Sequence, residues 1–377
     1  MSKARFIFDN AAVNTDLYYA TKFVTAHDPY AFFEYKNKKY LLLDMLEVGR
    51  AKKEAKVDKI LTVQDYREDI ELRKGNPGDI ADVLQVVFKK YKITTIEVPP
   101  SFPISFAQVL KKRGFKVQVG SFPFYPEKSK KGPAEKKVMI NAQKDVFKLF
   151  AFTEKILKKS KIKGNRLYYE GKVLTSEFVM FQLSVEMLKM GYNPKDSLIV
   201  ACGKDGADPH NLGSGPLKPH QLIIVDIFPR SEKTYYCGDA TRTFCKGKAP
   251  EKLKKQYNAV KKAQEYGIGL IKAGANGRII HEKIVKYFED LGYKTGEING
   301  SYQGFIHGTG HGIGLSVHEY PPFIAAKDCK LEAGQIVSVE PGLYYKGIGG
   351  VRIEDLVYIT KTGCEILAGY PKKLEIL

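Results

Sequence analysis

The chain has 377 residues, 44% of them apolar and 27% charged, and no apolar run approaches the roughly 18 residues that cross a bilayer. These values exclude a disordered or collagen-like chain and predict a globular protein that does not cross a membrane, long enough for two domains. The N-terminus MSKARFIFDN soon alternates polar and apolar residues, so we do not expect secretion through a signal peptide.

The excess of basic residues raises the question of an anionic partner. Lys and Arg number 61 against 42 Asp and Glu, a net charge of +19. The lysines are scattered along the chain in pairs such as Lys52-Lys53 and Lys254-Lys255, which indicates a solvated surface, so no specific nucleic-acid partner is expected. The five cysteines are widely spaced and include no Cys-x-x-Cys pair, which favours a reducing cytoplasm over a disulfide framework or thiolate site.

The first part of the chain alternates strand-like and helical patterns. Strands are predicted at 30–35, 40–43, 94–98 and 115–119, and helices at 46–55, 79–91 and 104–112. This alternation predicts a smaller α/β domain over residues 1–128. The polar stretch 126–137, with its two prolines and a glycine, marks the boundary, and a second domain is expected over residues 138–377.

The second part of the chain mixes helices with hairpins. Helices are predicted near 143–159, from an N-cap at Thr175 or Ser176 to about 189, and at 252–271 and 278–291. The segments QLIIVDIF and KTYYCGDATRTF are predicted to be strands joined by a polar turn at 230–233. Because little βαβ alternation occurs, we expect an α+β domain rather than a doubly wound sheet.

Two aspartates flank this predicted turn. Asp226 ends the apolar run LIIVD, and Asp239 immediately precedes ATRTF. A carboxylate at the end of a buried strand needs an ion pair, hydrogen bonds or a metal, and two facing each other favour a shared cation. The alternative interpretation is that Asp226 begins a turn and that Asp239 pairs with Arg242.

Three of the seven histidines, His307, His311 and His318, fall within the segment HGTGHGIGLSVHE. Its interleaved glycines make a helix improbable and indicate a backbone that approaches something closely. A single histidine there would more often be structural, whereas three of them followed by Glu319 favour a site.

Two glutamates stand in otherwise apolar strand patterns, Glu340 in IVSVEPGLY and Glu354 in GGVRIEDLVYI. With Asp226, Asp239 and one imidazole from His311, they make an oxygen-dominated set with more negative charge than one divalent ion needs. The set therefore predicts two metal ions, of a kind such as manganese, cobalt, iron or zinc, that share a bridging hydroxide.

These segments, in this order, resemble the pita-bread metallopeptidases, which include aminopeptidase P, prolidase and, more distantly, methionine aminopeptidase. The resemblance covers the whole chain, since the part around DLYYATKF looks like the creatinase/prolidase N-terminal domain. It implies an α+β pita-bread catalytic domain and a dinuclear metallo-exopeptidase, with manganese as the expected metal. Relatives are commonly dimers or tetramers, so a homo-oligomer is expected.

The resemblance also implies a role for each member of the ligand set. Asp226 would bind one metal, and His311 and Glu340 would bind the other. Asp239 and Glu354 would bridge the two metals.

Further residues match the family's catalytic and substrate-binding positions. Glu340 would shuttle a proton, His318 would donate to the developing oxyanion, and His307 would contact the substrate backbone. His210, in ADPHNLGSG, matches a histidine beside the substrate pocket. Arg352 is expected to orient the metal ligands through an ion pair, although a lone arginine there could equally be structural.

The hairpin departs from the family pattern. Asp226 and Asp239 stand two residues farther apart than is usual, and Ile227-Phe228 replaces the usual residue-glycine pair. One extra residue in each strand would keep both aspartates on the same face, because side chains alternate with period two. His220, where relatives tend to have glycine, is interpreted as a surface turn residue and not as a ligand.

The expected substrate is a proline-containing peptide. Dipeptide-specific prolidases resemble this chain through HEYP and then carry an arginine for the substrate's free carboxylate, where this chain has Pro322. The resemblance therefore implies release of an N-terminal residue before proline, as by aminopeptidase P, with an Xaa-Pro dipeptidase as the alternative. A non-catalytic relative that binds small molecules or basic proteins is a further alternative, although such relatives have lost metal ligands.

Overall fold

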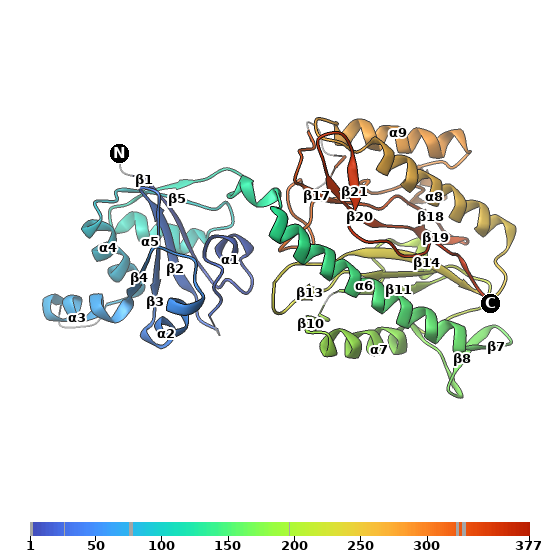
Figure 1. Ribbon diagram of the computed structural model, residues 1–377, viewed down its shortest axis with the longest axis horizontal. Coiled ribbons are helices and arrows are strands. Elements are labelled where there is room, and N and C mark those ends of the chain that lie inside the picture. Colours follow the sequence, from blue (N-terminus) through green and yellow to red (C-terminus); the bar gives the residue numbers. More distant parts are fainter. Residues whose placement is uncertain (1–2, 26, 75–77, 196, 322–323, 326–328) are drawn as a thin grey trace. The chain divides into compact units, whose positions relative to one another are not determined.

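The computed structural model describes residues 3–25, 27–74, 78–195, 197–321, 324–325 and 329–377. The chain forms two compact units, Met1–Lys128 and Ser129–Leu377 (Figure 1). Each unit has its own clusters of buried apolar side chains and is described by itself.

The first unit is built on a six-stranded sheet with the strand order β4-β3-β2-β1-β5-β6. Its strands are β1 (Lys3–Asp9), β2 (Tyr30–Tyr35), β3 (Lys38–Leu43), β4 (Lys59–Thr62), β5 (Thr95–Val98) and β6 (Lys116–Val119). β1, β2 and β3 are antiparallel, whereas β4, β5 and β6 each join a parallel neighbour. A tight hairpin turn connects β2 and β3, a helix lies in the connection between β1 and β2, and helical crossovers lead to the parallel strands.

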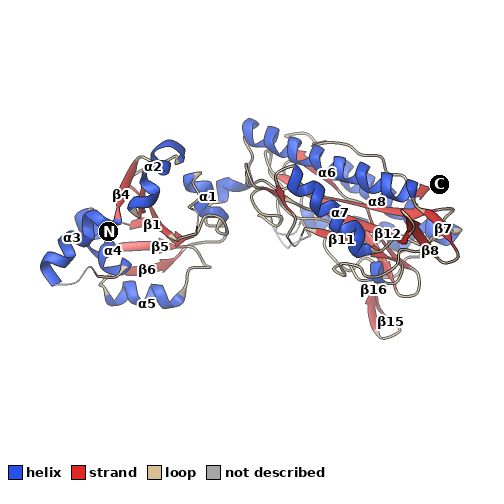
Figure 2. Ribbon diagram, turned by 90° about the horizontal axis from the view of Figure 1, so that it is seen from below, coloured by secondary structure: helices blue, strands red, loops and turns tan. Residues whose placement is uncertain are grey.

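Helices cover both faces of this sheet. They are α1 (Thr15–Thr21), α2 (Met45–Glu54), α3 (Val63–Lys74), α4 (Ile80–Lys90) and α5 (Ile104–Lys112). One apolar cluster includes residues of α4 and α5, and the other includes residues of α1 and α2, with the sheet between them (Figure 2). The predicted α/β alternation is present, and the predicted helix 104–112 and strand 30–35 have the observed bounds.

The second unit opens with α6 (Pro133–Lys159), which begins well before the predicted start at Gln143. Pro133 occupies the first turn, where its missing N–H forfeits no hydrogen bond, and Glu135 accepts from the N–H of Gly132 at 3.0 Å. Pro133 and Glu135 both lie inside the polar stretch 126–137, which the sequence predicted to be the boundary between the domains. Its polarity therefore reflects the first turn of a helix, and the prediction of the helix start was wrong.

The remaining helices and short 3₁₀ turns are α7 (Ser176–Lys189), α8 (Glu251–Leu270), α9 (Gly277–Asp290), η1 (Pro126–Ser129) and η2 (Asp205–Ala207). The main strands are β11 (Leu198–Cys202), β12 (Ile223–Ile227), β14 (Ala240–Lys246), β17 (Ile336–Val339), β18 (Gly342–Tyr345), β19 (Gly349–Arg352) and β20 (Asp355–Ile359). Shorter strands are β7 (Lys161–Lys163), β8 (Arg166–Tyr169), β9 (Lys172–Val173), β10 (Tyr192–Asn193), β13 (Arg230–Ser231), β15 (Gly296–Ile298), β16 (Ser301–Gln303), β21 (Cys364–Ile366) and β22 (Glu375–Ile376).

Helices flank the strands of this unit on two sides (Figure 1). The apolar side chains of α6 and α7 pack with those of β11, β12 and β14, and those of α8 and α9 pack with the strands from β17 to β20. Polar side chains on the strands that face away from these helices therefore meet in the middle of the unit. None of the helices in the described part of the chain combines the length and apolarity that a membrane crossing requires.

The long connection between β12 and β14 differs from the predicted simple turn. β14 begins at Ala240, so residues 233–239 do not extend the strand as predicted. Instead, β13 pairs with β10 and Arg230 bridges to Cys237. The extra residues are thus taken up in a second, smaller hairpin, which leaves the pairing of Ile227 with Ala240 in register.

Candidate metal centre

The register of β12 and β14 brings the two aspartates to one face. Asp226 pairs with Thr241, and Asp239 stands two residues before Thr241, so period-two alternation places their three side chains on the same side. Asp226 is 8% exposed and Asp239 is 3% exposed. Arg242 forms its ion pair with Asp355, at 2.6 Å. The alternative pairing of Asp239 with Arg242 is therefore wrong.

His311 presents one ring nitrogen to the carboxylates. Its Nδ1 lies 3.2 Å from the carbonyl oxygen of Gly312, which can only accept, so a neutral ring carries its proton on Nδ1 and leaves a lone pair on Nε2. Nε2 is 3.2 Å from Glu340 Oε1 and 3.6 Å from Asp239 Oδ2. The neighbouring backbone is packed tightly, because a Cβ on Gly310 would lie 2.0 Å from the carbonyl oxygen of Ser338.

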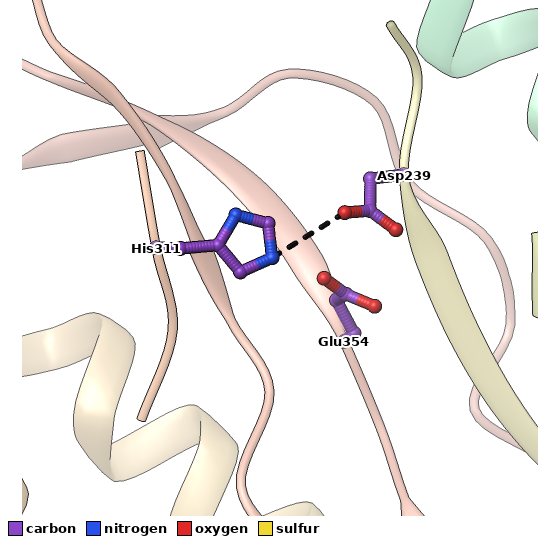
Figure 3. Close-up of side chains that lie close together, drawn as sticks. All are labelled: Asp239, His311 and Glu354. Carbon is purple, nitrogen blue, oxygen red and sulfur yellow. Dashed lines mark ion pairs between the residues drawn. The ribbon is translucent and has the colours of Figure 1, made fainter. Parts of the chain in front are cut away.

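The two glutamates lie at strand ends, not within strands as predicted. Glu340 directly follows β17 and accepts a hydrogen bond from Ser338 Oγ at 3.1 Å. Glu354 lies between β19 and β20 and accepts from Thr241 Oγ1 at 2.8 Å. Figure 3 shows the side chains of Asp239, His311 and Glu354 converging. In the described part of the chain, ligand atoms of these three lie within 4.8 Å of one another.

Burial and mutual repulsion shift the pKa values in this cluster. Burial, and then the charge of Asp226, raise the pKa of Asp239 well above its ordinary value. Burial and the charge of Asp239 do the same to the pKa of Glu354. Burial opposes the charged forms of Glu340 and His311 as well, but their mutual attraction outweighs it, lowering the pKa of Glu340 to about 2 and raising that of His311 to about 9. A bound cation would relieve this crowding of acids.

Two carboxylate oxygens support the same conclusion. Asp226 Oδ1 and Glu354 Oε1 are buried and have no hydrogen-bond partner among the residues that the structure describes. An unpaired buried polar atom costs about 1–3 kcal/mol, more when it is charged, so such atoms need a partner. Hard oxygen donors together with one imidazole suit a divalent cation. The residues present therefore fit the metal that the sequence predicts.

Arg352 lies against the aspartate side of the cluster. Its Nη2 donates to Asp226 Oδ2 at 2.7 Å, its Nε to Thr241 Oγ1 at 3.1 Å, and its Nη1 to the Tyr344 hydroxyl at 2.8 Å. Thr241 and Tyr344 were not among the predicted site residues. The period-two spacing from Asp239 would have identified Thr241, whereas nothing in the apolar run GLYY distinguishes Tyr344 from a core residue.

His307 is held by two protein partners. Its Nδ1 lies 2.8 Å from the carbonyl oxygen of Gly308, and its Nε2 lies 2.9 Å from the Tyr344 hydroxyl. Burial lowers the pKa of His307 to about 4, so the ring is neutral at pH 7 and the Tyr344 hydroxyl donates to it. Arg352, Tyr344 and His307 thus form one chain of hydrogen bonds. A direct bond from His307 to a peptide requires the exchange of one of these partners.

The other predicted histidines lie at different distances from the cluster. The His318 ring stands edge-on to His311, with centroids 4.4 Å apart. Burial, and then the charge of His311, lower the pKa of His318. His210 is exposed. His220 lies in an exposed turn with a φ of 59°, as predicted for a turn residue.

The chain is similar in sequence to known peptidases. Residues 164–361 match metallopeptidase family M24. A putative dipeptidase of Bacillus subtilis is 36% identical over 201 residues, which cover 53% of this chain and 53% of that protein. An Xaa-Pro dipeptidase of Lactobacillus delbrueckii is 36% identical over 180 residues, 48% of this chain and 46% of that protein. The chain therefore spans about half the length of these curated relatives.

Solved structures match over nearly the whole chain. An Xaa-Pro dipeptidase from Bacillus anthracis superposes with a TM-score of 0.82 and 27% identity, covering 99% of this chain and 95% of that one. An X-Pro aminopeptidase from Thermotoga maritima gives a TM-score of 0.80 over 100% and 98% of the two chains, with 24% identity that shows the fold alone.

The matches confirm the predicted α+β fold, in which a pita-bread domain follows a smaller α/β domain. They also confirm the predicted family, because the match to it covers more than half of the chain. Together with the buried Asp, His and Glu cluster, they show that the chain belongs to metallopeptidase family M24.

Proposed function

We propose that this protein is an Xaa-Pro dipeptidase that requires divalent metal ions. The observation that carries the proposal is the buried cluster of Asp239, His311 and Glu354, in which one oxygen of Glu354, like one of the neighbouring Asp226, has no hydrogen-bond partner among the described residues. The named activity of the Lactobacillus and Bacillus anthracis relatives supplies the substrate class.

The ligands in this proposal are Asp226, Asp239, His311, Glu340 and Glu354. Four carboxylates exceed the charge of one divalent ion, which favours two, and manganese suits such an oxygen-rich set. Bound ions of this kind polarise a carbonyl group and lower the pKa of a coordinated water. The Nδ1–H of His311 donates a hydrogen bond to the Gly312 carbonyl oxygen, which leaves the lone pair of Nε2 available to bind a metal.

The remaining residues would bind the peptide and stabilise developing charge. His318, beside His311, would donate a hydrogen bond to the carbonyl oxygen of the scissile bond. Glu340 would accept and return a proton. The hydrogen bonds from Arg352 to Tyr344 and from Tyr344 to His307 would fix the orientation of the His307 ring. The exposed His210 would lie along the path of the substrate.

A second candidate is an enzyme that releases the residue before proline from longer peptides, as an X-Pro aminopeptidase does. The observation that favours it is Pro322 at the position after HEYP, where dipeptide-specific relatives are expected to carry an arginine. The curated relatives favour the dipeptidase, and we rank it first. Without a cation at that position, another positive group would have to bind the free carboxylate.

Three substrates separate the two candidates. The protein, with Mn²⁺ added, is assayed on Ala-Pro, on Ala-Pro-amide and on Ala-Pro-Ala. A dipeptidase cleaves Ala-Pro and discriminates against the other two, because both lack a carboxylate on the proline. Equal or faster cleavage of Ala-Pro-Ala would overturn the dipeptidase proposal in favour of the aminopeptidase.

Two controls accompany this assay. Ala-Ala tests whether proline is required, and the Asp239→Asn variant tests whether the hydrolysis arises in this site. Cleavage of Ala-Pro by the variant at the wild-type rate would show that the activity arises elsewhere.

A further inference from the structure

A buried ion pair lies beside the metal cluster, outside the residues that would hold the metal. Lys131 Nζ is 2.8 Å from Glu319 Oε2, and the two side chains are 1% and 2% exposed. A single methyl group would disturb it, since a Cβ on Gly314 would lie 2.5 Å from Glu319 Oε2 and 2.8 Å from Lys131 Cε. Removing two charges so completely from water costs free energy, and this cost can cancel the gain from their attraction. A contribution to stability alone therefore does not explain why the pair is buried.

Glu319 closes the loop that starts at Gly312. Its N–H donates to the carbonyl oxygen of Gly312 at 2.7 Å. Its Oε1 accepts from the N–H groups of Leu315 and Ser316, at 2.8 and 3.3 Å. One carboxylate thus fixes the turn of the loop 312–319, which starts next to one histidine of the site and contains another.

Lys131 anchors that carboxylate from a distant part of the sequence. Its Nζ also lies 3.3 Å from the carbonyl oxygen of Ser129, and its backbone N–H donates to Gly334 at 2.7 Å. The backbone and the ammonium of Lys131 are therefore both held by groups other than Glu319. The pair acts as a fixed attachment between the start of the second unit and the loop 312–319.

His318 depends on this loop for its position. Within the described residues its ring makes no hydrogen bond, and its ring contact is with His311 at 4.4 Å. A side chain without its own hydrogen bonds takes its orientation from the backbone that carries it. The loop backbone at His318 is fixed on its next residue, by Glu319.

We propose that Lys131 and Glu319 are positioning residues that hold His318 at the distance and angle at which it meets the substrate carbonyl. The inference rests on the proposed peptidase function, in which His318 donates to that carbonyl. Neither Lys131 nor Glu319 touches the substrate in this account. Their contribution is the pre-set orientation of a hydrogen-bond donor.

The test compares wild-type protein with the double variant Lys131→Met/Glu319→Gln, which removes both charges and so leaves neither one buried and unpaired. We expect kcat for Ala-Pro with Mn²⁺ to fall about 10- to 100-fold, because misplacing a site group by about 1 Å can cost about 100-fold. Bound manganese per chain should equal that of wild type. The single variant Glu319→Gln, assayed below its unfolding temperature, gives a second measurement of the loss in kcat.

A double-mutant cycle with His318→Ala separates an effect on the position of His318 from an effect on stability alone. If the pair acts through His318, the double variant lowers kcat by about twofold or less once His318 is alanine, because residues that act as a unit are not additive. If the pair only stabilises the fold, its full effect persists in the His318→Ala background, and the proposal is overturned. Wild-type kcat in the double variant would overturn it equally.

The matched control is Lys130→Met, the adjacent lysine, whose pair with Glu332 at 2.6 Å is about half exposed on both sides. We expect this variant to keep the wild-type kcat, and a loss equal to that of the double variant would overturn the proposal. Failure of wild-type protein to hydrolyse any Xaa-Pro peptide would instead overturn the proposed function. The two failures are therefore distinguishable.

Discussion

Acidic residues lie in different surroundings in the two units of the chain. On the sheet of the first unit, Glu97 lies 2.6 Å from Lys3, with side chains 22% and 46% exposed, so each charge has both a partner and water. In the second unit, Asp239 and Glu354 are buried beside further carboxylates. An acid with an ion-pair partner and access to water can be replaced at little cost, whereas Asp239 and Glu354, which have no Lys or Arg partner among the described residues, need a bound cation.

The largest expected effect comes from removing one of the buried acids. Asp239→Asn should lower hydrolysis of Ala-Pro by roughly 10³-fold or more, because bound cations contribute several kcal/mol of transition-state stabilisation. The measurement is kcat/KM with Mn²⁺ added, and Glu97→Gln serves as the control from the first unit. Similar losses in both variants would contradict the contrast between the units.

Removal of the metal should be the next largest effect. Chelation should lower the free energy of unfolding by about 4 kcal/mol for each ion removed, relative to protein in manganese at a thousandfold excess over its Kd, since a ligand that binds only the folded state stabilises it. Urea unfolding with and without chelator gives the value. In the Asp239→Asn variant the difference should shrink, and an undiminished difference would place the metal elsewhere.

A pH dependence should follow in the chelated protein. The pKa of His311 is raised to about 9, because carboxylate attraction outweighs burial, so its contribution to stability is complete below about pH 6.5 and is lost as the pH rises through 9. The raised pKa of Asp239 acts in the same direction. Unfolding should therefore become easier by up to about 3 kcal/mol from pH 6.5 to 9. A flat profile without metal, or an equal fall with manganese bound, would contradict this.

The smallest effect is expected on the exposed side of the comparison. Lys3→Met should change the free energy of unfolding by about 1 kcal/mol or less, as is usual for exposed ion pairs. Activity should remain at the wild-type level. A thermal melt checks the stability, and the Ala-Pro assay checks the activity. A large loss of either would show that the exposed ion pairs of the first unit are not replaceable.

Local patterns were sufficient to predict part of this structure. Asp226 is conspicuous because it ends an apolar run, and the register with Thr241 places Asp226 and Asp239 on one face, as predicted. The extra residues do not lengthen each strand by one as predicted, because they form a separate small hairpin. The helix start at Pro133 was missed because a polar first turn resembles a linker, although the proline and Glu135 are start signals.

Contacts between distant residues were beyond such patterns. Lys131 and Glu319 are 188 positions apart; Glu319 stands out beside the histidines, but nothing in a lysine-rich chain marks Lys131 as its partner. Tyr344 looks like any core aromatic until Arg352 and His307 are seen on its hydroxyl. Sequence patterns indicate which residue types share a face, but only the packing of β18 against β19 and against the segment that carries His307 decides which of them meet.

Direct measurement of bound metal tests the central claim, that the buried acids form a metal site. Chelated wild-type protein and Asp239→Asn are dialysed against Mn²⁺, and bound manganese per chain is counted. We predict about two ions in wild type, as for a dinuclear centre, and a clear loss in the variant. Wild-type protein that binds no manganese, zinc, cobalt or iron, or a variant that binds as much as wild type, would contradict the account.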